Sequence, residues 1–233
     1  MKISILTGSD DFFEGPFSSG MIAQAIKKGL LDVDIVNLRE FASDNYRSID
    51  DYPFGGGGGM VLKCEPVFKA LKQITSQNSS EVKPRIIYTT PQGVQLDQNK
   101  AKELSLADEL IFICGRYKGI DERISQTWVT DEISIGDYVL SGGEIPVMVI
   151  LDAITRLLPE VLNNFDSAQT DSFEDGLLDC SFYTRPAEYQ GQKVPEVLLG
   201  GDHKKIEAFR LQDKLNRTKE KRPDLYEKYV NEE

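Results

Sequence analysis

The segment from Ser134 to Glu144 has the composition of a loop that holds a small ligand with its backbone. It contains Gly136, Gly142 and Gly143 around a Tyr-Val-Leu core, and a long apolar stretch follows at once. Glycine lets a backbone approach a ligand closely, and a glycine loop that leads into a helix often binds one. The chain has no Gly-Lys-Ser/Thr of a P-loop and no Gly-x-Gly-x-x-Gly. A ligand other than a nucleotide phosphate is expected, although a tight turn that caps a core helix explains this segment alone equally well.

Two further loops follow predicted strands. A strand over Arg85–Thr90 is interrupted by Pro91-Gln92-Gly93, and a strand over Glu109–Cys114 leads into Gly115-Arg116-Tyr117. Short apolar strands that alternate with helices predict an α/β domain with a mainly parallel sheet, and such sheets bind ligands at the carboxyl ends of their strands. Three loops should therefore converge on one pocket: Tyr88–Gly93, Gly115–Gly119 and Ser134–Gly143.

Hydrophobic patterning predicts the elements that would position these loops. Residues 144–159 are apolar nearly all round, which is typical of a helix buried in a core or at a subunit interface. Within this helix Asp152 and Arg156 have the spacing of an intrahelical ion pair. The other predicted elements are strands over Lys2–Leu6 and Val33–Val36, and helices after Ser18-Ser19, over Pro66–Ile74, from about Asp202 and after Pro223.

Two polar stretches separate these elements. The connection from Arg39 to Gly59 includes Asp50 and ends in five consecutive glycines, and loops of this length are usually functional or mobile. Residues 162–175 are acid-rich and are predicted to be a linker. Beyond them, residues 176–233 are expected to form a smaller unit with two helices.

Composition places limits on the class of protein. A hydrophobic share of 40% over 233 residues is ordinary for a globular protein. No apolar run approaches the roughly 20 residues that span a bilayer, and the first apolar run is too short for a signal peptide. The three cysteines are widely spaced and odd in number, which favours reduced thiols over disulfides or a zinc site. We therefore expect a cytoplasmic protein with no membrane partner.

The net charge of −11 argues against indiscriminate binding of nucleic acid. Residues 203–222, however, hold eight Lys or Arg against three acids. A local basic strip of this kind can contact phosphates even in an acidic protein. A solvated helix face is the more common explanation of such a run.

Considered together, five motifs in order make the chain resemble the bacterial tRNA (guanine-N1)-methyltransferases, which methylate the guanine 3′ of the anticodon. The resemblance extends from the first strand to about Tyr226. Each motif alone is weak, but the ordered set is specific. The motifs are Tyr88-Thr89-Thr90-Pro91-Gln92-Gly93, Gly115-Arg116-Tyr117 with Gly119-Ile120-Asp121-Glu122-Arg123, Ser134 to Glu144, Asp171-Ser172-Phe173 with Asp175-Gly176-Leu177-Leu178-Asp179, and Tyr183-Thr184-Arg185-Pro186.

The resemblance implies an α/β fold whose parallel sheet carries a deep C-terminal trefoil knot, plus a small, mainly helical C-terminal domain. Knots are so rare that patterning alone would not predict one. By the resemblance, residues 1–161 are the knotted catalytic domain, 162–175 a flexible linker and 176–233 a tRNA-binding domain. It also implies a homodimer with composite active sites.

By the same resemblance, the three loops bind S-adenosylmethionine in a bent conformation and release S-adenosylhomocysteine. Backbone groups would contact the adenine, which fits the glycine content. The residues expected to bind it are Tyr88, Thr90, Pro91, Gly93, Gly115, Tyr117, Ser134, Ile135, Gly136, Asp137, Tyr138, Val139, Leu140, Gly142, Gly143 and Pro146.

The chemistry of the acceptor makes a demand of its own. N1 of guanine carries a proton and is a poor nucleophile until that proton leaves, so a positioned carboxylate can serve as general base. The resemblance gives this role to Asp171, and it makes Arg156 the group that stabilises negative charge on O6. Sequence context alone would favour a linker carboxylate or helix cap for Asp171, and an ion pair with Asp152 for Arg156.

The target base must leave the anticodon-loop stack to reach the methyl group. The Gly55–Gly59 loop is a candidate to receive it, because five glycines are costly to order and suit a loop that orders on tRNA binding. A plain flexible hinge is the alternative. The expected tRNA contacts are Asp50, Gly59, Arg185, His203 and Arg217.

Some residues depart from the family pattern. Lys118 stands where many relatives carry a glutamate associated with divalent metal, so no metal ligand is assigned and a Mg²⁺ requirement is in doubt. The other departures are Tyr46, Gly8-Ser9-Asp10 and Ser181-Phe182. Two alternative functions remain: another knotted methyltransferase acting on RNA ribose or ribosomal RNA, and a catalytically silent S-adenosylmethionine- or RNA-binding regulator. The Asp171 motif argues against the first, and the presence of both Arg156 and Asp171 against the second.

Overall fold

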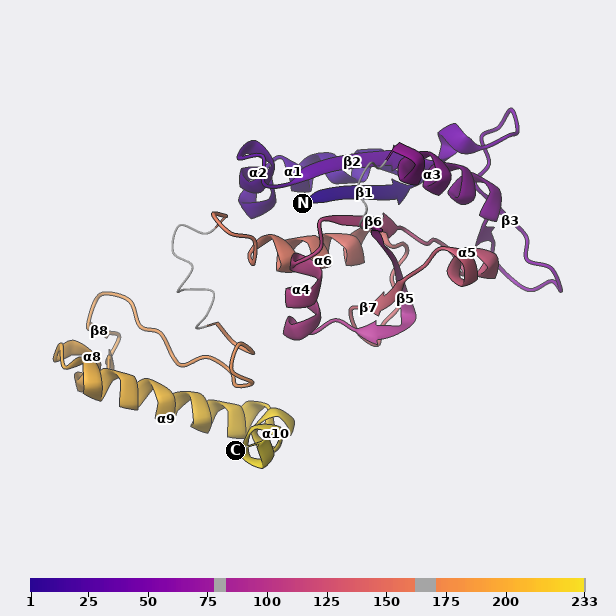
Figure 1. Cartoon of the computed structure of the whole chain (residues 1–233). Helices are drawn as coiled ribbons and strands as arrows, with labels where there is room; N and C mark the ends of the chain where they lie inside the picture. Colours follow the sequence, from indigo (N-terminus) through magenta and orange to yellow (C-terminus); the bar gives the residue numbers. More distant parts are fainter. Residues whose placement is uncertain (78–82, 162–170, 233) are drawn as a thin grey trace. The chain divides into compact units, whose positions relative to one another are not determined.

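Five strands form one parallel sheet in the computed structural model, which describes residues 1–77, 83–161 and 171–232 (Figure 1). The strand order is β2-β1-β6-β5-β7, so the chain leaves β1 for an edge and later inserts β6 between β1 and β5. The predicted α/β fold with a mainly parallel sheet is confirmed. The strands are β1 (Lys2–Thr7), β2 (Asp32–Asn37), β5 (Arg85–Gln95), β6 (Glu109–Ile113) and β7 (Asp131–Ser134).

Helices cover both faces of the sheet, because successive strand residues point to opposite sides. In β6, Leu110 and Phe112 belong to one buried cluster, and Ile111 and Ile113 belong to the other. The first cluster is closed by η1 (Asp10–Phe13), α1 (Glu14–Phe17), α2 (Gly20–Lys27), α4 (Gln98–Ser105) and α6 (Glu144–Thr155). The second is closed by η2 (Leu38–Phe41), α3 (Cys64–Gln77) and α5 (Glu122–Thr127).

The strands and helices predicted within residues 1–161 are all present, with changed boundaries. β5 does not end at Thr90 as expected. It continues to Gln95, because the register shifts between Thr89 and Val94 and the strand then pairs again with β7. A proline at a bulge is compatible with a strand, since no ladder hydrogen bond is needed there. The predicted helix over 144–159 ends earlier, at Thr155.

The connection from Arg39 to Gly59 has more structure than its composition predicts. Asp50 and Asp51 form β3 (Asp50–Asp51), which pairs antiparallel with β4 (Val61–Leu62). The five glycines lie in the loop of this hairpin. Of the described residues, none lies in a helix that is long and apolar enough to cross a bilayer.

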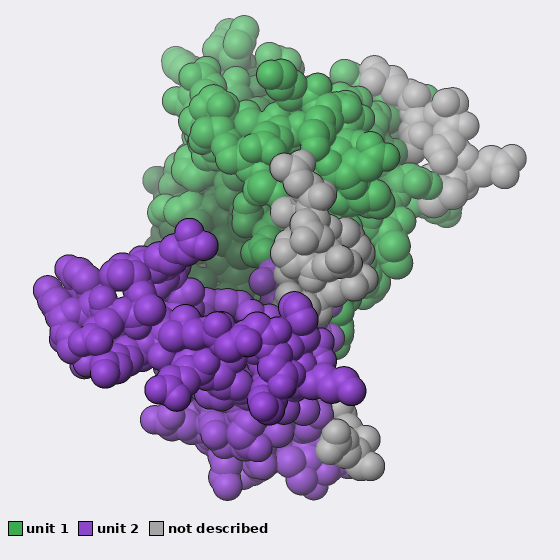
Figure 2. Space-filling view, turned by 90° about the vertical axis from the view of Figure 1, so that its left-hand side faces the viewer, with its two compact units in different colours: residues 1–163 green, residues 164–233 purple. Residues whose placement is uncertain are grey.

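Contacts divide the chain into two compact units, residues 1–163 and 164–233 (Figure 2). The second contains α8 (Glu196–Leu199), the long helix α9 (His203–Lys221) and α10 (Pro223–Glu232), as well as a small hairpin of β8 (Glu188–Tyr189) and β9 (Gln192–Lys193). The Asp202 side chain caps α9 by accepting a hydrogen bond from the N–H of Lys205. Of the linker expected over 162–175, residues 162–170 lie outside the described residues, and residues 171–175 form turns that belong to the second unit.

Candidate active site

A cleft of about 400 Å³ lies at the carboxyl ends of β5, β6 and β7. The three loops that the sequence singles out form its walls, as expected for ligand sites in parallel sheets. Every residue predicted to bind S-adenosylmethionine lines this cleft except Gly93 and Asp137. The convergence of the three loops was therefore predicted correctly from the sequence.

Gly93 has a structural reason of its own. A Cβ at this position would lie 2.3 Å from the backbone carbon of Glu132 in β7. Only glycine allows the two strands to approach so closely after the bulge in β5. Gly93 thus allows close packing of β5 and β7, the strands that lead into two of the cleft loops.

At the N-terminus of α6, Gly143 is required because the neighbouring backbone leaves no room for a side chain. A Cβ on Gly143 would lie 2.7 Å from Cα of Cys114, and the N–H of Gly143 donates to the carbonyl of Gly115 at 2.8 Å. A Cβ on Gly142 would lie 2.3 Å from a carboxylate oxygen of Glu144. The loop before α6 is therefore packed directly on the end of β6, with backbone facing the cleft.

A buried acid holds these walls together. Glu144 is 4% exposed, and its Oε1 accepts hydrogen bonds from Thr7 Oγ1 at 2.8 Å and from Arg116 Nε at 3.1 Å. Arg116 also donates to Ser9 Oγ at 2.7 Å, and the N–H of Ser9 donates to Thr7 Oγ1 at 3.0 Å. A buried carboxylate at the N-terminus of a helix is further stabilised by the helix dipole. This network joins the end of β1, the loop after β6 and the start of α6.

The network was not predicted, since its members are far apart in sequence. Local patterning gives no sign that Thr7 and Glu144 meet across 137 positions. One clue was available: Glu144 is an acid at the start of an otherwise apolar helix, and a buried acid needs a partner. The cleft is also lined by residues that were not singled out as ligand contacts, among them Arg116, Lys118, Glu122 and Glu132.

Burial favours the neutral form of two titratable side chains beside the cleft, Tyr88 and Cys114. Burial raises the pKa of the Tyr88 phenol, so this hydroxyl stays protonated. Burial also raises the pKa of the Cys114 thiol well above its usual range, and the nearby Glu144 carboxylate adds to this shift. Cys114 is therefore inert as a nucleophile.

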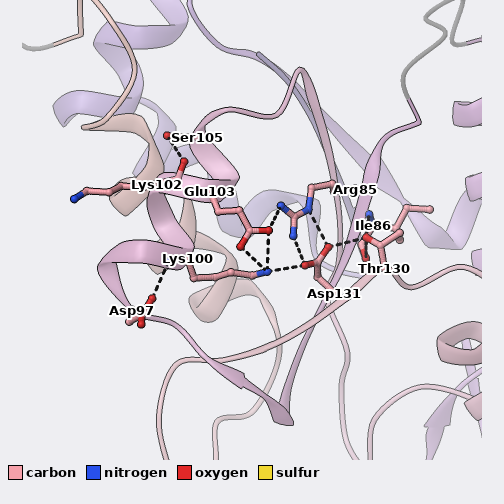
Figure 3. Close-up of polar contacts among 9 residues, drawn as sticks. All are labelled: Arg85, Ile86, Asp97, Lys100, Lys102, Glu103, Ser105, Thr130 and Asp131. Atoms are coloured by element: carbon pink, nitrogen blue, oxygen red, sulfur yellow. Dashed lines mark hydrogen bonds and ion pairs between the residues drawn. The ribbon is translucent and has the colours of Figure 1, made fainter. Parts of the chain in front are cut away.

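The strand pair that carries two of the loops is fixed by an ion-pair cluster at its other end (Figure 3). Arg85 and Lys100 both bind the carboxylate of Asp131, at 3.0 Å from Arg85 Nε and 2.9 Å from Lys100 Nζ. Glu103 accepts from Arg85 at 2.6 Å, and Thr130 Oγ1 donates to Asp131 at 2.8 Å. The cluster joins the first residues of β5 and β7 to α4.

The glycine hairpin β3–β4 is attached to the cleft wall by backbone hydrogen bonds. The N–H of Lys118 donates to the carbonyl of Met60 at 3.1 Å, and the N–H of Leu62 donates to the carbonyl of Gly119 at 3.0 Å. A Cβ on Gly59 would lie 3.1 Å from Cγ of Lys118. Gly59 therefore lies beside the cleft, whereas Asp50 lies at the base of the hairpin.

Comparison with known proteins identifies the family. The family model for tRNA (guanine-1)-methyltransferase TrmD matches residues 1–228. The chain belongs to the tRNA (guanine-1)-methyltransferase TrmD family. The resemblance inferred from the five motifs is thereby confirmed.

Relatives of this family match nearly the whole chain. A tRNA (guanine-N(1)-)-methyltransferase of Shouchella clausii is 52% identical over 229 residues, covering 98% of this chain and 93% of the relative. A protein of the same name from Halalkalibacterium halodurans is 51% identical over 227 residues, covering 97% and 92%. Another from Ruminiclostridium cellulolyticum is 49% identical over 231 residues, covering 99% and 98%.

In this TrmD family member, the residues predicted to act in catalysis or to contact tRNA lie outside the cleft lining. Arg156 is exposed and caps the C-terminus of α6 in the first unit. In the second unit, Asp171 is partly buried at the start of a turn, and Arg185 is exposed before a cis peptide bond to Pro186. His203 is the exposed first residue of α9, and Arg217 donates to Ser181 Oγ at 3.0 Å.

The described residues do not fit the metal ion considered for the family. No group of three or more His, Cys, Asp or Glu side chains in the described part of the chain is placed to hold one. Lys118, a cation, lines the cleft.

Proposed function

We propose that this protein transfers a methyl group from S-adenosylmethionine to N1 of the guanine at tRNA position 37. The observation that supports this most directly is the convergence of three motif-bearing loops on one cleft in a chain of the TrmD family. The names of the relatives support the nature of the acceptor.

The cleft suits S-adenosylmethionine in size and in chemistry. Its volume of about 400 Å³ lies in the range of small-molecule sites. The backbone of Gly115, Gly142 and Gly143 faces it without side chains, which suits hydrogen bonds to an adenine ring. Glu122 and Glu132 also line it, and their negative charge favours a cationic sulfonium.

The chain's own residues then prepare the acceptor. S-adenosylmethionine, when bound, supplies an electrophilic methyl group. We assign Asp171 as the general base that removes the N1 proton, and Arg156 as the cation that stabilises the charge that develops on O6. The cleft loops hold the donor in one orientation, which provides a large part of the acceleration when N1 is in line.

The path of the chain after β7 supports a C-terminal knot. β7 is an edge strand, yet the loop that follows it returns to the end of β6, where Gly143 binds Gly115, and Glu144 reaches Thr7 in β1. α6 then packs against α2 and α4. A segment that runs back across the ends of the central strands is the geometry that such a knot needs.

We further propose a homodimer with active sites shared between subunits. Ile145 and Val149 of α6 are 44% and 43% exposed, and Val139 in the preceding loop is 91% exposed. An apolar set of this kind next to a binding cleft suits contact with a second copy of the chain. Basic residues of α9 would bind part of the tRNA acceptor. The protein would act in the cytoplasm.

The decisive test of the function is methyl transfer from labelled S-adenosylmethionine to tRNA transcripts. Two transcripts should differ only at the base 3′ of the anticodon, guanine in one and adenine in the other. Labelling of the guanine transcript alone is expected. Equal labelling of both would refute the proposal.

The role of Asp171 has its own test. Asp171→Asn removes the proton acceptor and keeps the size of the side chain. Turnover should fall by roughly 100-fold or more, within the range that general bases contribute, while the Kd for S-adenosylmethionine measured by calorimetry stays the same. Undiminished turnover would remove Asp171 as the base.

A further inference from the structure

The turns that begin at Asp171 are docked on one face of α9. Asp213, Lys214, Arg217 and Thr218 are spaced so that they lie together on this helix, and all four contact the segment 171–181. This set of four residues is called the inner face of α9 below.

The contacts of the inner face are short and specific. Lys214 Nζ binds Asp175 Oδ2 at 2.5 Å, and Asp213 Oδ2 accepts from the N–H of Ser181 at 2.6 Å. The hydroxyl of Thr218 accepts from the N–H of Leu178 at 2.9 Å and donates to the carbonyl of Lys214 at 2.8 Å.

The contacts of Thr218 are shielded from water, whereas the Lys214–Asp175 pair is partly open to solvent, because the Asp175 side chain is 49% exposed. Thr218 is fully buried, and the Lys214 side chain is only 14% exposed. Leu177 is also fully buried, so the segment carries its own apolar anchor. Polar contacts away from solvent are stronger and more directional than the same contacts on a surface.

The segment is also closed on itself, which transmits the docking to Asp171. The N–H of Phe173 donates to the carbonyl of Leu177 at 2.7 Å, and the N–H of Asp179 donates to Ser172 Oγ at 2.9 Å. The N–H of Glu174 donates to the carbonyl of Asp171 at 3.3 Å. Asp171 is thus the first residue of a folded turn and not part of a free strand of linker.

The rest of α9 presents cations to solvent. Lys204, Lys205, Arg210, Lys219 and Lys221 are exposed, in contrast to the partly buried Lys214. The helix therefore separates two roles: one set of residues holds the Asp171 turn, and another is available to an anionic partner.

We propose that α9 positions the Asp171 carboxylate for the reaction of the proposed function, with Lys214 and Thr218 as positioning residues. RNA that binds the exposed cations of α9 is then held at a fixed position relative to the Asp171 carboxylate, which removes the N1 proton of its guanine. A general base must lie within hydrogen-bond reach of its proton, and a misplacement of about 1 Å can cost roughly 100-fold in rate.

The test removes the two contacts singly. Lys214→Met keeps the aliphatic stem, and Thr218→Val keeps the shape of the side chain without its hydroxyl. In each variant, kcat for the guanine transcript should fall roughly 10- to 100-fold. KM for the transcript and the Kd for S-adenosylmethionine should stay within about threefold of the wild type, because neither binding surface changes. Lys214→Arg and Thr218→Ser restore the contacts and should recover most of kcat.

Matched variants of exposed cations on the same helix provide the control. Lys204→Met and Lys221→Met should weaken RNA binding and reduce the slope of log Kd against log salt by about 1 each. Lys214→Met and Thr218→Val should leave RNA affinity nearly unchanged and lower kcat. The two pairs of variants then separate positioning of the Asp171 carboxylate from binding of the RNA.

Two outcomes would overturn the inference. One is unchanged kcat in both Lys214→Met and Thr218→Val. Another is a fall in kcat that only follows the fraction of unfolded protein in thermal melts and is not recovered by Lys214→Arg or Thr218→Ser. If the wild-type protein is active and either of these two outcomes is found, the proposal that α9 positions Asp171 is wrong, but the proposed function stands. If the wild-type protein transfers no methyl group to the guanine transcript, the proposed function itself fails.

Discussion

The two glycine-rich loops of the first unit have similar compositions but need glycine for different reasons. In the loop 134–143, a Cβ on Gly142 or Gly143 would overlap atoms of Glu144 or Cys114. In the loop 55–59, a Cβ on any of the first four glycines would meet nothing within 4 Å. Three of these four, Gly55, Gly56 and Gly57, have positive φ, at 86°, 77° and 113°.

The difference indicates two kinds of binding surface. The loop 134–143 is fixed by packing and by a buried acid, so its shape exists before any ligand arrives. The hairpin loop is joined to the cleft wall on its C-terminal side, through Met60 and Leu62, and its conformational freedom is the costly term on binding. A preformed surface suits a small donor, whereas a loop that orders on contact suits a large and variable RNA.

The largest expected effect comes from breaking the buried acid's network. Glu144→Gln removes the charge that Arg116 and Thr7 bind, and breaking a buried pair typically costs about 3–5 kcal/mol. The free energy of unfolding from urea titration should fall by this order, and donor affinity should fall with it. Glu65→Gln, which breaks an exposed pair with Lys69, should cost less than about 1 kcal/mol. Equal costs for the two variants would contradict a preformed loop.

A smaller effect is expected from filling the space at Gly143. Its φ of −81° is accessible to alanine, so Gly143→Ala tests room alone. The added methyl group would meet Cα of Cys114 at 2.7 Å, and overpacking of this kind costs about 1–3 kcal/mol. The Kd for S-adenosylmethionine, measured by calorimetry, should rise at least tenfold. Gly58→Ala is the matched control, since that site has open space and no positive φ.

How much of this could be predicted depends on how local each signal is. The helix at 144–155 and the three loops were predictable, because hydrophobic runs and Gly or Pro punctuation are local features. β7 was missed, since Asp-Glu-Ile-Ser is mostly polar and becomes a strand only because Ile133 pairs with Thr89 and Val94 of β5. The helix α5 was missed although Asp121 is a visible cap, whose side chain accepts from the N–H of Arg123.

The rest of the site could not be read from patterning, because it depends on tertiary contacts. Neither the insertion of β6 between β1 and β5 nor the contact of Glu144 with Thr7 has a local signature. The docking of 171–181 on α9 is similar: the acid-rich composition suggests a linker, but Asp175 and Asp213 are used to hold a turn.

The pH dependence of stability should reveal the contribution of the Asp131 ion-pair cluster, which joins the first residues of β5 and β7 to α4. Burial by itself would raise the pKa of Asp131, but hydrogen bonds from Arg85, Lys100 and Thr130 outweigh burial and hold this pKa below its ordinary value. The folded protein therefore binds the proton less readily than the unfolded chain does. The stabilisation is fully present above the unfolded pKa of about 4 and is lost as the pH falls below it.

Asp131→Asn provides the measurement. The urea midpoint of the wild type should decrease between about pH 4 and pH 2 more steeply than that of the variant. Asp224→Asn should change this slope much less, because the pKa of Asp224 is also lowered by its pair with Arg222, but that pair is exposed to water. Parallel curves for the wild type and Asp131→Asn would show that the cluster does not support the strand pair.

The smallest effect is expected from alanine substitutions in the hairpin loop. Gly57 and Gly58 both have open space around them, so Gly57→Ala and Gly58→Ala compare two sites that differ in backbone conformation. Gly57 has a φ of 113°, a region that alanine avoids at a cost of about 1–3 kcal/mol, whereas Gly58 has no such requirement. Because the loop is exposed, it can relax around Gly57→Ala, so the melting temperature and the Kd for S-adenosylmethionine should hardly change in either variant. KM for the tRNA transcript should rise a few-fold in Gly57→Ala and stay constant in Gly58→Ala. If Gly58→Ala raises KM as much as Gly57→Ala does, then overall flexibility of the loop and not its left-handed backbone is what the RNA requires.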